Sequence, residues 1–118
     1  MTRRTERLNA LLREEISELL TREVKDPRLG GLISVTHVDV SPDLHHARVS
    51  ISTLGADDEA EVMRALHSAA PFLRRELMQR LTMRHVPELS FRRDDSIRQG
   101  AEMLSLIHDV ISPEEPKP

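Results

Sequence analysis

Arginine side chains in the middle of the chain are the groups best suited to bind another molecule. Between residues 64 and 98 the sequence carries eight arginines and no lysine, against four acidic residues. A guanidinium group is a planar fork of donors that matches the oxygen atoms of a phosphate better than an ammonium group does. This stretch therefore predicts a local phosphate-binding face. Charge alone leaves an ordinary solvated helix face as the alternative.

Pro71 divides two segments with helical periodicity, and Arg74 and Arg75 follow it. A proline inside a helix costs about 3 kcal/mol, whereas a proline at the first helical position is favourable. The sequence therefore predicts a helix over 58–70 and a second helix that begins at Pro71. Free backbone N–H groups at that helix start, together with the two arginines, predict a phosphate site.

No pattern of catalytic residues is recognisable. The chain has no cysteine and no Gly-x-Ser-x-Gly sequence, and its four glycines cannot form a Gly-x-x-Gly loop. His45 and His46 lack further ligands at metal spacing, and helix capping explains Asp94 and Asp95. We therefore expect no enzyme activity, no metal ion and no cofactor. With only two phenylalanines and no other aromatic residue except histidine, a base-stacking surface is not expected either.

Hydrophobic periodicity predicts the elements that must position these residues. A change of side-chain parity near Thr36 and His37 indicates either a bulge in the first strand or burial of the strand on both faces. Three strands with helices on one face predict an α+β, two-layer domain with a three-stranded sheet. The long connection before the last strand permits this strand to pair parallel to its neighbour. The predicted order is a helix over 4–24, strands over 32–40 and 46–54, helices over 58–70 and 71–81, a strand over 89–91 and a helix over 97–111.

Length and charge limit the remaining possibilities. The 118 residues carry a net charge of −3 and suit one domain over 1–111 with a disordered tail over 112–118. No secretory signal or membrane-spanning run is visible, so we expect a cytoplasmic monomer that does not contact a membrane. Arginines on one face can still bind RNA, because salt screening makes the interaction with phosphate local.

Four stretches of the chain carry a resemblance: EVKDPRLGG (23–31), VDVSPDLHHARVSIS (38–52), ALHSAAPFLRREL (65–77) and LTMRHVPELSFRRDDSIRQG (81–100). Together they resemble the bacterial ribosome-binding factor A family. The resemblance implies a type II KH-like fold, α-β-β-α-kink-α-β with an added C-terminal helix. An Ala-x-Gly kink replaces the KH loop in this family; the matching residues here are Ala69, Ala70 and Pro71, so proline stands where the family has glycine.

The resemblance also implies a function without catalysis. Members of the family bind the free small (30S) ribosomal subunit and assist late maturation of 16S ribosomal RNA (rRNA) near its 5′ end, above all in the cold. The expected partners are therefore the small subunit and its 16S rRNA, with assembly GTPases as further partners to consider. The alternative is a protein-interaction module that docks a partner protein instead of RNA.

The arginines near the kink and the last strand are the predicted RNA-binding residues. Arg80 has an equal alternative to RNA binding. It could lie at the edge of the core, where the apolar part of its side chain is buried and the guanidinium reaches solvent. The N-terminal arginines Arg3, Arg4 and Arg7 form a second candidate cluster. The predicted RNA-binding residues are Arg74, Arg75, Arg80, Arg84, Arg92 and Arg93.

Overall fold

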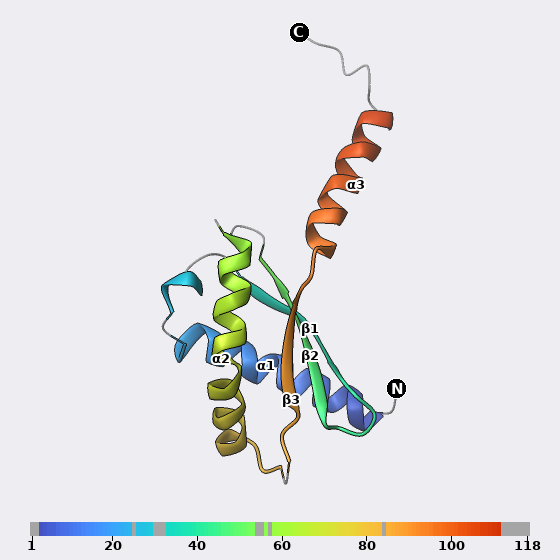
Figure 1. Cartoon of the computed structure of the whole chain (residues 1–118). Helices are drawn as coiled ribbons and strands as arrows, with labels where there is room; N and C mark the ends of the chain where they lie inside the picture. Colours follow the sequence, from blue (N-terminus) through green and yellow to red (C-terminus); the bar gives the residue numbers. More distant parts are fainter. Residues whose placement is uncertain are drawn as a thin grey trace.

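Three helices and a three-stranded sheet form the fold, so the predicted α+β class is confirmed (Figure 1). The computed structural model describes residues 3–24, 26–29, 33–53, 56, 58–83 and 85–111, and the side chains only as far as 108. The predicted tail over 112–118 therefore lies outside the described residues. The elements are α1 (Arg3–Arg22), η1 (Pro27–Leu29), β1 (Ser34–Val40), β2 (His46–Ser52), α2 (Glu59–Arg80), β3 (Glu88–Arg93) and α3 (Ser96–Ile111).

The sheet has the order β1-β2-β3. β1 and β2 pair antiparallel as a hairpin, and β2 and β3 pair parallel. The register between β1 and β2 shifts between Val35 and His37, which confirms the predicted bulge. β3 is longer than predicted because Arg92 and Arg93 continue its pairing with β2.

Helices α1 and α2 cover one face of the sheet, which we call the helix face (Figure 1). Both helices place an apolar stripe against the strands, as their leucine spacing predicts. The other side, the open face, carries the polar residues that alternate with the core residues of each strand. Fully buried helix residues include Leu12, Ile16, Leu19, Leu66, Leu73 and Leu77. The open face consists of His37, Asp39, His46, Arg48, Ser50, Glu88, Ser90 and Arg92.

The predicted helix boundary at Pro71 is wrong, because α2 runs through this residue without interruption. Leu66, Leu73 and Leu77 lie on one continuous stripe and are fully buried. Burial of three leucines stabilises by about 1.5–3 kcal/mol each, which outweighs the cost of about 3 kcal/mol for one internal proline. The N–H groups after Pro71 therefore bond within the helix, and the predicted phosphate site on free amides is also wrong.

Helix α3 points away from the sheet and the other helices (Figure 1). Its apolar side chains, predicted to share one side of the helix, are widely exposed: 46% for Ile97 and 69% for Leu104. Asp94 positions the helix start, because its carboxylate accepts a hydrogen bond from the Ser96 amide at 2.9 Å. Among the described residues, no helix is both long and apolar enough to cross a bilayer.

Candidate nucleic-acid interface

Arg74 is bound within the fold. Its Nε and Nη2 atoms donate to the carbonyl oxygen of Val86, at 3.1 and 3.0 Å. Val86 is fully buried in the segment before β3. Arg74 therefore joins α2 to that segment and has a structural role that the sequence did not indicate.

Replacing Arg74 with alanine is expected to lower the free energy of unfolding by about 1.5–2 kcal/mol, because the Val86 carbonyl loses a charged donor. Its neighbour Arg75 is exposed, so Arg75→Ala is the matched control and should change stability by less than about 0.5 kcal/mol. Urea unfolding of both variants measures the difference. Equal stability of the two variants would show that the Arg74–Val86 contact contributes nothing.

Arg80 contacts α1. One guanidinium nitrogen lies 3.5 Å from carboxylate oxygens of Glu15 and Glu18. A second nitrogen lies 3.8 Å from Glu23. The arrangement ties the end of α2 to α1 and favours the core-edge alternative for this residue.

Arg93 belongs to an ionic cluster between the starts of α2 and α3. Its guanidinium lies 2.7 Å from Glu59 and 3.2 Å from Asp95. Arg98 pairs with the other carboxylate oxygen of Glu59. The hydrogen bond from Arg98, assisted by the charge of Arg93, holds the pKa of Glu59 below its usual value. The cluster neutralises two arginines close to where α3 leaves the domain.

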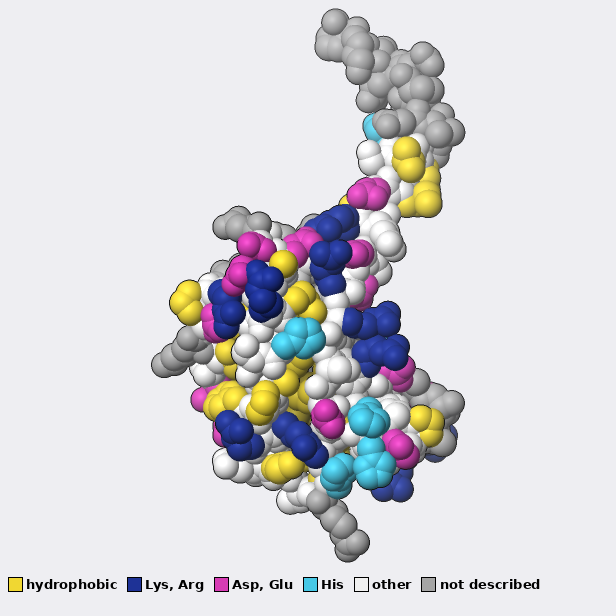
Figure 2. All heavy atoms as spheres, viewed as in Figure 1, with side chains coloured by type: hydrophobic (Ala, Val, Ile, Leu, Met, Phe, Trp, Pro, Cys, Tyr) yellow, Lys and Arg dark blue, Asp and Glu magenta, His cyan; other side chains and the backbone are white. Residues whose placement is uncertain are grey.

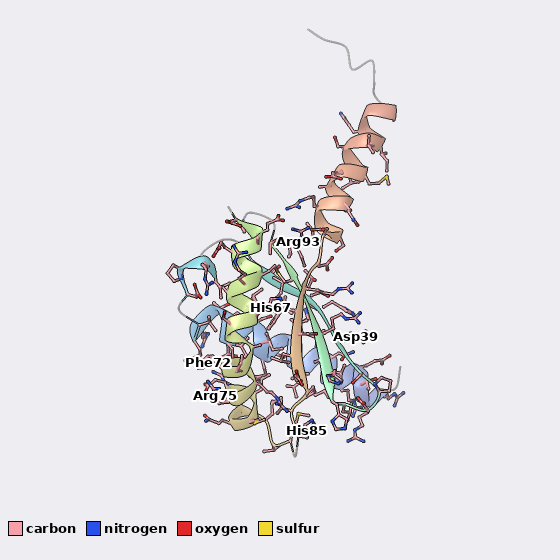
Figure 3. The ribbon with its side chains drawn as sticks, in the orientation of Figure 1. Asp39, His67, Phe72, Arg75, His85 and Arg93 are labelled. Atoms are coloured by element: carbon pink, nitrogen blue, oxygen red, sulfur yellow. The ribbon has the colours of Figure 1, made fainter. Side chains whose placement is uncertain are left out.

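The six predicted arginines do not gather on one surface. Arg75 is exposed on α2, on the side away from the strands, whereas Arg93 lies near the start of α3 (Figure 3). Arg92 is exposed on the open face, across the sheet from α2. Arg84 lies outside the described residues. Ala69 and Ala70, predicted with Pro71 to replace the KH loop, are helical and pack against the core.

Arg48 is an exposed residue that the predicted set omitted. It lies on β2 between the buried residues Ala47 and Val49, so its side chain is on the open face. The alternation of β2 already placed it on the solvent side. The second candidate cluster also has a defined place, because α1 begins at Arg3 and carries Arg4 and Arg7 in exposed positions.

Hollows on the described surface lie on both sides of the sheet region. One of about 640 Å³ lies between α1, η1 and β1, and none of the predicted arginines that the structure describes lines it. Another, of about 220 Å³, lies on the open face beside Arg48 and Ser90. His45 and His85 face each other with Nδ1 and Nε2 3.3 Å apart, yet no three metal-ligating side chains gather within the described ranges.

Comparison with known proteins identifies relatives along most of the chain. The family model described as ribosome-binding factor A matches residues 4–107. The ribosome-binding factor A of Synechocystis sp. is 45% identical over 111 residues, which cover 92% of this chain and 84% of the relative. That of Stutzerimonas stutzeri is 45% identical over 113 residues, which cover 92% and 87%.

Two solved structures share the fold. The crystal structure of ribosome-binding factor A from Thermus thermophilus superposes with a TM-score of 0.69 at 30% identity, covering 75% of this chain and 93% of that one. A homology model of the Thermus thermophilus protein, fitted into a cryo-EM map of a 30S complex, gives 0.62 at 30% identity, with 74% and 91% covered. With the sheet order and the family match, these similarities establish that the chain belongs to the ribosome-binding factor A family.

Proposed function

We propose that the protein binds the free small (30S) ribosomal subunit and assists late maturation of 16S rRNA, with the strongest requirement in the cold. The observation that carries this proposal is the similarity to the Thermus thermophilus protein fitted into a map of a 30S complex. The fold supports a binding role because exposed arginines lie on the sheet and on the two helices that pack against it.

The contact with rRNA is proposed to consist of arginine–phosphate interactions. Such contacts fix the position of RNA without reading its sequence. Of the six predicted arginines, Arg75 and Arg92 form no salt bridge with another described residue. Arg74, Arg80 and Arg93 can contribute only by sharing donors with their partners inside the protein.

Binding to purified free small subunits should weaken steeply as salt rises. With about four phosphate contacts, the affinity is expected to fall about 50- to 150-fold between 50 and 200 mM salt. Co-sedimentation over a salt series measures this, with large subunits as the control. Deletion of the gene should increase 16S rRNA with an unprocessed 5′ end, more at low temperature than at the optimum. No association with small subunits at low salt, together with normal 5′ ends, would contradict the proposal.

A protein-docking function has one observation in its favour. Helix α3 exposes Met103, Leu104 and Leu106, each with more than half of its surface accessible. A partner that covered this apolar side would bind with little dependence on salt. The same salt series therefore separates the two functions, because only phosphate contacts release counterions.

A further inference from the structure

We propose that the open face of the sheet binds the phosphodiester backbone of helical RNA through Arg48 and Arg92. This inference rests on the proposed function, because it assigns the RNA contact of that function to one surface. The surface is on the opposite side of the sheet from α2, which carries Arg75, and it includes Arg48, which the sequence pattern around the kink did not indicate.

The register places the two arginines close together. Arg48 of β2 is opposite Ser90 of β3, and Arg92 is opposite Ser50. The two arginines thus lie on neighbouring strands, offset by two residues on the same face. Strand separation and rise put their Cα atoms about 8 Å apart. Both residues are exposed, so their long side chains can hold one phosphate together or two successive phosphates.

Both guanidinium groups are available to an external anion. Among the described residues, neither Arg48 nor Arg92 forms a salt bridge, although Asp39 is directly opposite Arg48 in the register. About half of the described arginines, by contrast, are bound within the protein. The bound arginines are Arg22, Arg28, Arg64, Arg74, Arg80, Arg93 and Arg98.

Asp94, the acidic group nearest to Arg92 in sequence, is already occupied. Its Oδ2 accepts a hydrogen bond from the Thr36 hydroxyl at 2.5 Å, and its Oδ1 accepts from the Ser96 amide at 2.9 Å. The Thr36 bond is the main reason that the pKa of Asp94 is lowered, with smaller contributions from Ser96 and from the charge of Arg92. The carboxylate thus holds the bulge of β1 and the start of α3, and leaves the Arg92 donors unbridged.

The composition of the open face indicates backbone contact with helical RNA. Phe91, the aromatic ring in β3, is buried on the helix face, so among the described residues the open face offers bases no phenyl ring to stack on, and its rings are the imidazoles of His37 and His46. Helical RNA keeps its bases stacked and presents phosphates outward. Figure 2 shows Lys and Arg side chains on the right of the body, the side of the strands on which Figure 3 places Asp39.

Asp39 and Glu88 limit where a phosphate can lie. Both are exposed on the open face, toward its hairpin end. Asp39 is in the same row as Arg48, so its charge weakens the hold of Arg48 on a phosphate and shifts a phosphate shared by the two arginines toward Arg92. Removing the charge of Asp39 should therefore strengthen RNA binding, a gain that a purely structural role for this residue does not predict.

Fluorescence anisotropy with a labelled RNA duplex, and co-sedimentation with free small subunits, test the proposal on the full chain. The double variant R48Q/R92Q should bind the duplex about 30-fold more weakly, with a salt slope less negative by about 1.5–2. The matched double variant R22Q/R64Q has the same charge change in the exposed, internally paired residues Arg22 and Arg64, and should lose less than threefold. The variant D39N should bind about threefold more tightly. Thermal unfolding of each variant confirms that it is folded.

Equal losses in the two double variants, or an unchanged salt slope in R48Q/R92Q, would overturn the assignment. Failure of the unsubstituted protein to bind the duplex would overturn it as well. Binding of the duplex that depends on Arg48 and Arg92, without association with small subunits, would support this surface and contradict the proposed function instead. The two proposals therefore fail in different experiments.

Discussion

Leu77→Ala is expected to lower the free energy of unfolding by about 3–4 kcal/mol. The Leu77 side chain is fully buried where α2 packs on the sheet, so its truncation loses transfer free energy and leaves a cavity. A domain of this size is stable by about 5–15 kcal/mol, so the change removes a large part of its total stability. Chemical denaturation with an unchanged m-value measures the loss under two-state conditions.

The adjacent residue provides the matched control for Leu77. Met78 is on the outer side of α2 with 47% of its surface exposed, so Met78→Ala should cost less than about 1 kcal/mol. The ratio of the two effects tests which side of α2 faces the strands. Similar losses in both variants would contradict the orientation of the helix.

Pro71→Ala is expected to raise the free energy of unfolding by about 2 kcal/mol. Proline has no N–H group, so the carbonyl of His67 lacks its donor in the middle of α2. Alanine restores this donor and recovers about 3 kcal/mol, from which a gain in unfolded-chain entropy subtracts about 0.4–1 kcal/mol. Thermal and urea unfolding of the variant give the sign and the size of the change.

Pro42 is the control for Pro71, because it separates the effect of proline on the unfolded chain from the loss of a hydrogen bond within a helix. It is exposed in the turn between β1 and β2, outside any helix, so Pro42→Ala changes mainly the unfolded chain and should lower stability by about 0.4–1 kcal/mol. Opposite signs for the two substitutions are therefore expected. A loss of stability in Pro71→Ala would mean that packing on the sheet requires the distortion that proline introduces.

The sequence predicted the elements well where periodicity and burial agree. The stripe of α1 and the bulge near Thr36 followed from side-chain spacing, because each pattern is tied to a buried face. The long connection before β3 permitted the parallel pairing that the structure has. The helix boundary predicted at Pro71 is wrong because the burial of Leu73 and Leu77 on the same helix outweighs the local cost of proline. Local helix propensity predicts a helix boundary poorly where a long apolar stripe continues past a proline.

The candidate site was harder to predict than the fold. Charge spacing identified the arginine-rich stretch, yet it could not show that Arg74 would bind the Val86 carbonyl or that Arg80 would meet carboxylates of α1. These partners are 12 or more residues away in sequence, so only the three-dimensional fold reveals them. Arg48 was predictable from the alternation of β2, but it stands in an acidic region where charge counting gave no signal.

The projecting helix α3 has a hydrodynamic consequence. The radius of gyration is 17.7 Å and the longest axis is 64 Å, whereas a compact chain of this length has a radius of gyration of about 13–14 Å. Friction in solution follows shape as well as mass, so one copy of the chain migrates through a sizing column like a heavier sphere. Elution volume alone would therefore suggest self-association, whereas sedimentation equilibrium, which depends on mass and not on friction, reports the number of copies directly.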